Sequence, residues 1–368
     1  MEYLSVFDSL GQPTDRSVLR GDKFEKFSSN EHIGLAVIFI ENDKGEFLIQ
    51  KSSKEKGSYY SSTGGHINFS ETPLETIKRE VKEELGINID NDHIIPIGYL
   101  LYDMPIRFIF YLNKNIDIKK IKLQEEEVES INFFKVSDIK KLIKEKKMLE
   151  SHVKMFEEVL KYKEEYLDSK DVITLYKNEE YLRQVSEDVK KDDINLINDI
   201  KILEEFCKNN DVMAMAAVQL GIPKRIIYLK NTNIDLINKK MDNSETDEEK
   251  VYNEAKVLIN PVVLKKEGLT EYWEACRSCG NNVGLVKRPY KIKIKYYDIN
   301  HNEHTDIFKG FESTVLSHEL DHLDGILHID IADKLYIMMS EERKKLRQKE
   351  GYNIIRKTKD FKSNVENI

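Results

Sequence analysis

Two segments rich in metal-ligand residue types lie in opposite halves of this chain, and together they constrain its fold. The first, GGHINFSETPLETIKREVKEELGI, spans residues 64–87, and the second, SHELDHLDG, spans residues 317–325. The chain has 368 residues, which is too long for one ordinary hydrophobic core and suits two domains of typical size. No internal repeat relates the two halves. The sequence therefore predicts two unlike modules, each with its own site.

Charge and cysteine usage exclude several classes of function. The net charge is −8, with acidic and basic residues interspersed, so we expect no broad DNA-binding face. Three cysteines, Cys207, Cys276 and Cys279, are too few for a disulfide framework and fit a reducing compartment. The N-terminus lacks a signal-peptide pattern, and no run reaches the roughly 18 apolar residues that span a bilayer. We therefore expect a soluble, cytoplasmic protein without a membrane partner.

The first half has the pattern of an α/β domain. β-rich runs at residues 32–40 and 46–52 flank a turn that contains Gly45. A loop rich in glycine, serine and tyrosine then leads into a predicted helix over residues 72–85. The apolar periodicity of residues 137–166 predicts further helix.

The segment YLDSKD, residues 166–171, is the best candidate for a domain boundary. It follows a long polar helix and precedes VITLY, a run that predicts a fresh strand. We therefore expect domains at residues 1–166 and 171–342, followed by a basic tail, residues 343–368, that forms a terminal helix with frayed ends. The acidic segment 243–256 lacks apolar periodicity and is predicted to be a surface insertion.

The upstream segment carries three glutamates spaced to share one face of a helix: Glu80, Glu83 and Glu84. Like charges so placed repel by roughly 0.2–0.5 kcal/mol per pair on an exposed helix, and a hard divalent cation would turn that repulsion into coordination. Arg79 can hold Glu71 and so fix the preceding loop, while Gly65 allows the backbone to approach a metal closely. The alternative is an acidic, solvated helix, which is common in a chain with 66 acidic residues.

This segment resembles the Nudix box, G-x5-E-x7-R-E-U-x-E-E-x-G-U, at every defined position, and the resemblance extends over about residues 30–145. It implies an α/β/α sandwich in which Glu80, Glu83 and Glu84, together with Gly65, bind Mg²⁺ or Mn²⁺. It also implies hydrolysis of a nucleoside-diphosphate-type small molecule, with Glu84 as a catalytic residue as well as a ligand.

The downstream segment places His318 and His322 one helical turn apart, as two imidazole ligands of one metal require, with Glu319 placed to take a proton from water. Two histidines on a surface helix could also coincide by chance. The third ligand is open. In one interpretation Cys276 and Cys279 join two further histidines, His301 and His304, in a closed structural zinc site. In the other, one cysteine joins His318 and His322 and leaves a position for water.

A third segment, VMAMAAVQLGIPKRIIYL, residues 212–229, favours the open site. Gln219 follows a run of small residues, and a side-chain amide beside a metal could stabilise a developing oxyanion. Without the other two motifs, Gln219 would be interpreted as a polar cap at the end of a buried helix.

Together these segments resemble peptide deformylase over about residues 171–335, through VMAMAAVQ, EACRS and HELDHLDG in the family's order. The resemblance implies an α+β fold and a metal, usually Fe²⁺ with Zn²⁺ or Ni²⁺ able to substitute, bound by Cys276, His318 and His322. It implies removal of the formyl group from N-formylmethionyl peptides by water on the metal. Glu319 would shuttle the proton, and Gln219 with the backbone N–H of Arg277 would hold the oxyanion.

The chain departs from the family's pattern in the residues around these ligands. Val212 and Ala214 replace the glycines of the first motif, and Ala275 replaces the glycine of the second. Arg277 stands where leucine is usual, and Ser317 where glutamine is common. The missing glycines matter because they let a peptide backbone lie close to the protein, so Val212 and Ala214 could narrow the cleft.

The sequence favours a bifunctional metallohydrolase that acts on nascent formylated peptides, as produced in bacterial protein biosynthesis, and on a small nucleotide-type diphosphate. The alternative is that the deformylase-like half is a degenerate peptide-binding module and only the Nudix half is catalytic.

Overall fold

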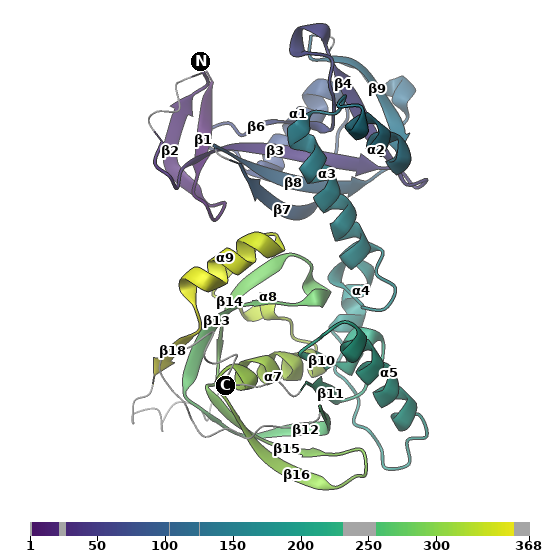
Figure 1. Ribbon diagram of the computed structural model, residues 1–368, viewed down its shortest axis with the longest axis vertical. Coiled ribbons are helices and arrows are strands. Elements are labelled where there is room, and N and C mark those ends of the chain that lie inside the picture. The colour runs from purple at the N-terminus through teal and green to yellow at the C-terminus, as the bar shows by residue number, and fades with distance from the viewer. Residues whose placement is uncertain (1, 22–26, 103, 125, 231–254, 357–368) are drawn as a thin grey trace. The chain divides into compact units, whose positions relative to one another are not determined.

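The computed structural model describes residues 2–21, 27–102, 104–124, 126–230 and 255–356 (Figure 1). The chain divides into two compact units. One runs to Lys163 and includes residues 337–339, and the other comprises the described residues from Glu164 to Tyr336 and from Ser340 onward. Most of the predicted insertion at residues 243–256 and the end of the predicted basic tail fall outside the described residues.

In the part of the chain that the structure describes, the N-terminal unit is built on one sheet of nine strands. The strands are β1 (Tyr3–Phe7), β2 (Pro13–Leu19), β3 (His32–Glu41), β4 (Glu46–Ser52), β5 (Tyr60–Ser61), β6 (Thr63–His66), β7 (Ile95–Leu101), β8 (Pro105–Asn113) and β9 (Val128–Lys135). β3 pairs parallel with β8 and antiparallel with β1, β4 and β6. Nearly every residue of β3 is buried, which requires cover on both faces of the sheet.

Among the described residues, three α-helices accompany this sheet: α1 (Pro73–Leu85), α2 (Val136–Lys144) and α3 (Glu150–Tyr162). Helix α1 begins where the sequence predicts, because Thr72 and Glu75 form a capping box, and it ends at Gly86, whose φ of 66° is left-handed. Phe156 of α3 packs against Phe39 and Phe47, with ring centroids 5.8 and 5.2 Å away. The helical prediction for residues 137–166 is interrupted between α2 and α3, where Lys146 has a φ of 56°.

The C-terminal unit contains two antiparallel sheets within the described residues. One sheet has the order β10 (Ala214–Ala216), β11 (Ile226–Leu229), β12 (Lys256–Glu267), β15 (Lys291–Tyr297) and β16 (Glu303–Lys309). The other has the order β17 (Lys334–Ile337), β14 (Asn282–Arg288), β13 (Leu269–Ala275) and β18 (Asn353–Arg356). The helices are α4 (Leu175–Leu182), α5 (Leu196–Asn209), α7 (Gly310–Leu323), α8 (His328–Ile331) and α9 (Ser340–Glu350).

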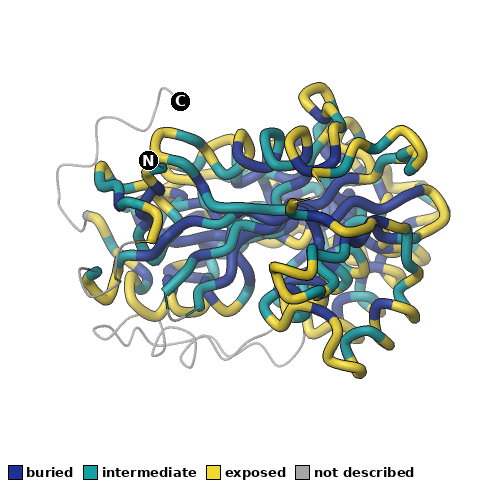
Figure 2. Tube along the Cα trace, turned by 90° about the horizontal axis from the view of Figure 1, so that it is seen from above, coloured by how far each residue is buried: buried dark blue, intermediate teal, exposed yellow. Residues whose placement is uncertain are grey.

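Helix α7 is the central element of this unit. Its residues Leu316, Leu320 and Leu323 belong to a buried cluster with Ile292 and Phe308 of the five-stranded sheet. Figure 2 shows the buried residues running along the strands, while the exposed ones gather on loops and outer helix faces. The mixture of sheets and helices confirms an α/β unit followed by an α+β unit.

Of two predictions made from the sequence at the ends of the C-terminal unit, one is wrong and the other holds only in part. The predicted strand VITLY does not form, because helix α4 begins at Leu175 and Val172 and Ile173 are packed as side chains rather than paired in a sheet. The predicted terminal helix ends at Glu350, and β18 follows it and pairs with β13.

Among the described helices, none is long and apolar enough to cross a membrane.

Candidate functional site

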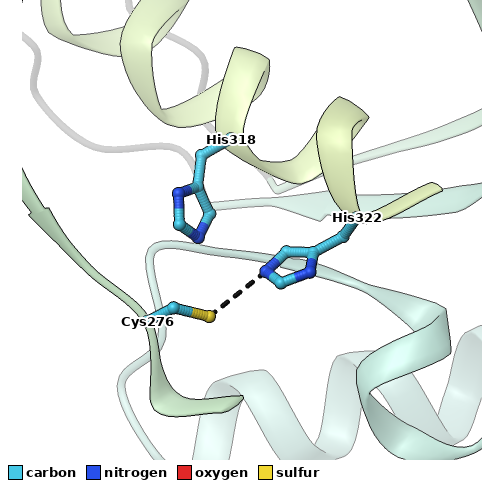
Figure 3. Close-up of side chains that lie close together, drawn as sticks. All are labelled: Cys276, His318 and His322. Atoms are coloured by element: carbon cyan, nitrogen blue, oxygen red, sulfur yellow. Dashed lines mark hydrogen bonds between the residues drawn. The ribbon is translucent and has the colours of Figure 1, made fainter. Parts of the chain in front are cut away.

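Helix α7 and the end of strand β13 bring three ligand-type side chains together. The ligand atoms of Cys276, His318 and His322 all lie within 4.8 Å of one another, and Figure 3 shows the three side chains pointing toward a common point. Sγ of Cys276 is 3.1 Å from Nε2 of His322. Cys276 directly follows β13, and His318 and His322 are one turn apart on α7, so two regular elements position the set.

A buried chain of ion pairs orients His318. Nδ1 of His318 lies 2.8 Å from a carboxylate oxygen of Glu274, and Arg288 donates two hydrogen bonds of 2.8 and 2.9 Å to that carboxylate. Arg288 also bonds to Asp321 on α7. The bond to Glu274 turns Nε2 of His318 toward Cys276, which is the arrangement that orients a ligating imidazole.

The chemistry of the three side chains fits a transition metal. The hydrogen bond from Cys279 lowers the pKa of Cys276 well below its usual range, with the nearby His322 as a further cause, and this favours the thiolate that binds metals. Burial by itself would lower the pKa of His318, but its bonds to Cys276 and Glu274 raise it above the ordinary value. One thiolate and two imidazoles form a donor set suited to zinc or iron.

Glu319 and Gln219 lie beside these ligands. The backbone N–H of Ala216 donates to Glu319 at 2.8 Å and to Oε1 of Gln219 at 3.1 Å. The anchored oxygen leaves Nε2 of Gln219 to donate to Sγ of Cys276 at 3.4 Å and to Oγ of Ser278 at 3.1 Å. Burial raises the pKa of Glu319 above its ordinary value.

The closed zinc site built on Cys276, Cys279, His301 and His304 is not assembled. His304 is exposed, and its Nε2 lies 2.8 Å from Asp298. Among the described residues, the group of three close enough to share an ion contains Cys276 but not Cys279. Cys279 and Cys207 are buried thiols.

A cavity of about 270 Å³ opens beside the three ligands. We call it the active-site cavity, and it is lined by Val212, Met213, Ala214, Met215, Gln219, Tyr272, Glu274, Ala275, Cys276, Arg277, Phe311, Thr314, Val315, His318, Glu319 and Arg347. The side chains that replace the motif glycines therefore line the cavity without filling it. Arg277 begins a short 3-10 helix, Arg277–Cys279, where backbone N–H groups lack partners within the helix.

In the N-terminal unit, the guanidinium group of Arg79 forms hydrogen bonds with several carboxylates of the upstream segment, residues 64–87. Its Nε donates to Glu71 at 2.9 Å, which confirms the predicted fixing of the loop. Its Nη1 also donates to Glu80 at 2.7 Å and to Glu83 at 3.1 Å. The three glutamates share one helix, and Arg79 bonds to Glu80 and Glu83, whereas Glu84 accepts a bond from Gln50.

Glu84 lies in a buried environment of its own. Nε2 of Gln50 donates to it at 3.0 Å, and Oε1 of Gln50 accepts a bond from Thr63 at 3.0 Å. Burial raises the pKa of Glu84 to about 7, although the bond from Gln50 opposes that shift. Gln50 was missed in the sequence because it belongs to no spaced motif, and only the path of β4 beside α1 brings it to Glu84.

Gly65 is needed for space. A Cβ placed on it would lie 2.1 Å from a carboxylate oxygen of Glu80, closer than real Cβ contacts allow. The predicted approach of a metal to this backbone stays a prediction, and the group that lies beside Gly65 in the structure is the carboxylate of Glu80.

Comparison with known proteins matches the two units separately. A family model described as polypeptide deformylase matches residues 171–336, and one described as NUDIX domain matches residues 31–159. A peptide deformylase of Leptospira biflexa serovar Patoc is 32% identical over 154 residues, which cover 40% of this chain and 80% of that protein. A peptide deformylase of Erythrobacter litoralis is 33% identical over 181 residues, covering 45% and 92%.

Solved structures of peptide deformylases also match a part of the chain. A peptide deformylase from Synechococcus elongatus in complex with actinonin matches with a TM-score of 0.37 and 25% identity, covering 49% of this chain and 86% of that one. A class I type b peptide deformylase from Acinetobacter baumannii with bound Met-Ala-Ser matches with a TM-score of 0.36 and 23% identity, covering 43% and 95%.

Proposed function

The chain belongs to the peptide deformylase family through residues 171–336 and carries a NUDIX domain at residues 31–159, and from this premise we propose a bifunctional metallohydrolase. The C-terminal half removes the formyl group from N-formylmethionyl peptides. The N-terminal half hydrolyses a small nucleoside-diphosphate-type substrate. Both reactions belong to the cytoplasm, where formylated chains are made.

The observation that carries the first activity is that Glu319 and Gln219 line one cavity with Cys276 and His318, two of the three ligand-type side chains, and that His322 completes the group of ligands. Cys276, His318 and His322 would hold Fe²⁺, or Zn²⁺ or Ni²⁺ in its place. Such an ion supplies Lewis acidity that makes water a better nucleophile.

The protein's own residues supply proton transfer and charge stabilisation. The buried carboxylate of Glu319 takes a proton from the attacking water and passes it to the amine that leaves when the C–N bond of the formamide breaks. The products are formate and a free N-terminal amine. Nε2 of Gln219 and the backbone N–H of Arg277 donate to the oxygen that becomes negative as water adds to the formyl carbon.

Formate release from formyl-Met peptides tests this proposal. Protein loaded with Fe²⁺ under anaerobic conditions should release formate, and Glu319→Gln should lower kcat by about 10²–10⁴-fold. The variant should keep the metal content of the wild type, because Glu319 is not among the three ligands. If loaded wild-type protein released no formate, the C-terminal half would instead be a degenerate peptide-binding module.

For the N-terminal half, we propose that Glu80, Glu83 and Glu84 bind Mg²⁺ or Mn²⁺ together with the backbone of Gly65. Arg79 bonds to Glu80 and Glu83 in the structure, and a divalent ion held by the three glutamates would supply positive charge to the diphosphate. Glu84, held by Gln50, would also accept the proton of the attacking water.

A panel of nucleoside diphosphate derivatives and of capped or triphosphorylated RNA ends tests this second activity. With the substrate that is cleaved, Glu83→Gln and Glu84→Gln should each lower turnover by about 10²-fold or more. The matched control is Lys82→Gln, an exposed position on the same helix, which should retain wild-type turnover. Unchanged turnover in both glutamate variants would rule out the glutamate site.

A further inference from the structure

A second cavity of about 320 Å³ adjoins the active-site cavity in the C-terminal unit. We call it the arginine pocket, and it is lined by Glu165, Tyr166, Ala275, Cys276, Arg277, Arg343 and Arg347. Ala275, Cys276, Arg277 and Arg347 line both cavities. A molecule that fills the active-site cavity therefore reaches the arginine pocket along a shared wall.

The charges on this wall are unbalanced. Three guanidinium groups face the arginine pocket, against the single carboxylate of Glu165. Among the ion pairs of the described residues, none involves Arg277, Arg343 or Arg347, although most other arginines of the unit are paired with carboxylates. The pocket is thus rich in positive charge that the protein itself does not neutralise.

Two of these arginines are held in place by contacts that leave their charge free. Nε of Arg347 donates to the carbonyl of Trp273 at 2.8 Å, and its guanidinium lies 4.9 Å from the ring centroid of Tyr272. Nη1 of Arg277 donates to Asn210 at 3.3 Å, and its guanidinium lies 5.4 Å from the ring centroid of Phe206. Neutral partners position these groups without cancelling their charge.

Arg343 and Arg347 are half-buried, whereas Arg277 is exposed. A half-buried guanidinium group without a counter-charge loses hydration, and an anion that joins it restores the lost interactions. Burial lowers the pKa of Arg347, and the neighbouring Arg343 adds to this effect, which is the electrostatic sign of the same imbalance. Guanidinium groups bind carboxylates in a planar, two-pronged geometry. An extended peptide advances about 3.3 Å per residue, so a residue shortly after the formylated one could reach the arginine pocket.

We propose that the arginine pocket binds the carboxylate of an acidic side chain located downstream of the formylmethionine in the peptide substrate. This proposal rests on the deformylase activity proposed above and names its preferred substrates. The preference lies in substrate binding rather than in the chemical step, because the arginine side chains act beyond the reacting formyl group.

Amidated formyl-Met tetrapeptides test this inference, because amidation removes the C-terminal carboxylate as a competing anion. Glu, Gln or Lys is placed in turn at the second, third and fourth positions. At one position, the Glu peptide should have a KM about tenfold lower than the Gln peptide, with similar kcat, and the Lys peptide should be the poorest. The difference should shrink at high salt.

Variants of helix α9 locate the effect. Arg343→Gln should reduce the Glu-over-Gln preference to less than twofold while leaving kcat for the Gln peptide unchanged, which also shows that the variant is folded. The matched control, Lys344→Gln, changes an exposed charge on the same helix and should keep the full preference. If Lys344→Gln lost the Glu-over-Gln preference to the same extent, only the overall charge of α9 would matter, and the proposal that the arginine pocket binds the acidic side chain would be overturned.

Calorimetric binding of the deformylated, amidated tetrapeptides separates this proposal from the proposed activity. Tighter binding of the Glu peptide, lost in Arg343→Gln, supports the arginine pocket even if no formate is ever released. Equal binding of the Glu and Gln peptides overturns it. It is also overturned if inorganic phosphate binds in an Arg343-dependent manner while the peptides show no preference, because the pocket would then serve a free anion.

Discussion

At the scale of single residues, Cys276 and Cys279 lie only three positions apart in the sequence but have different roles. Both thiols are buried in one cluster with Leu182 and Leu327, but of the two only Cys276 belongs to the group with His318 and His322 that could hold a metal ion. The hydrogen bond from Cys279 favours the thiolate form of Cys276 without adding a fourth ligand.

The two cysteine variants should therefore differ in metal content. Cys276→Ser removes one of three protein ligands, and purified protein should lose nearly all tightly bound transition metal. Cys279→Ser should keep at least half of the wild-type amount, with weaker retention in chelator. Metal analysis of dialysed protein measures both. A metal-free Cys279→Ser protein alongside a loaded Cys276→Ser protein would reverse the assignment of the sulfur ligand.

Gly65 gives a prediction in the other unit. Gly65→Ala forces the carboxylate of Glu80 to move, because the added Cβ would lie 2.1 Å from its oxygen. We expect Mg²⁺ or Mn²⁺ affinity, followed as the metal dependence of diphosphate cleavage, to fall by about 10-fold or more. Formate release should be unchanged, and a parallel loss of that activity would mean that the substitution disturbs more than Glu80.

The ligand and proton-transfer residues of short motifs could be predicted from the sequence, but the hydrogen-bond partners of those residues could not. The spacing of His318, Glu319 and His322 on one helix predicted their common face. Gln50, Glu274 and Arg288 were missed as site partners, because each is brought in by strand pairing between segments distant in sequence. Such contacts depend on register, which a single sequence does not specify.

At the scale of elements, helix α7 serves as both core and site. Its leucines are buried against the five-stranded sheet, while His318 and Glu319 line the active-site cavity and His322 lies beside Cys276 and His318. Helix boundaries with explicit signals were predicted well, as at Thr72 and Gly86. Strands β14 and β16 were not predicted, because their apolar periodicity is short and their pairing with β13 and β15 makes them strands.

Glu312 in the first turn of α7 makes the stability of this element depend on pH. Burial raises its pKa to about 7 from 4.5, with Lys256 opposing the shift and Asp306 adding to it. Between these values the folded state holds a proton that the unfolded state has lost, so stability falls as pH rises through about 7. Glu312→Gln should therefore be more stable than the wild type at pH 8, by on the order of 1–3 kcal/mol.

Thermal unfolding at pH 5 and pH 8 checks this expectation. The gap between variant and wild type should be present at pH 8 and nearly absent at pH 5, where Glu312 is protonated. The control Glu341→Gln, at an exposed site on α9, should show no such change. A gap of equal size at both pH values would mean that the amide stabilises the helix for another reason.

At the scale of the whole molecule, each unit has its own buried core and its own candidate site. The two sites differ in ligand type, with thiolate and imidazole in one and carboxylates in the other. Removal of a soft transition metal should therefore destabilise only the C-terminal unit, because a ligand that binds the folded state raises its stability by mass action.

Calorimetry of the full chain with and without a transition-metal chelator measures this selectivity. We expect one unfolding transition to shift down by about 5 °C or more and the other to stay in place. The Cys276→Ser protein should show no response to the chelator, which identifies the shifted transition. A shift of both transitions in the wild type would contradict separate metal dependence.

The ion pairs that run from Asp321 through Arg288 and Glu274 to His318 begin and end on the same helix, three residues apart. They form a closed ring that fastens α7 to β13 and β14 in a single rotational setting. A mutation that rotated or shifted α7 would have to break both of its contacts with the strands, Asp321–Arg288 and His318–Glu274, at the same time. Substitutions at these positions during evolution should therefore occur in compensating pairs. A single substitution at Asp321 should change the orientation of His318, although the two side chains are not bonded to each other.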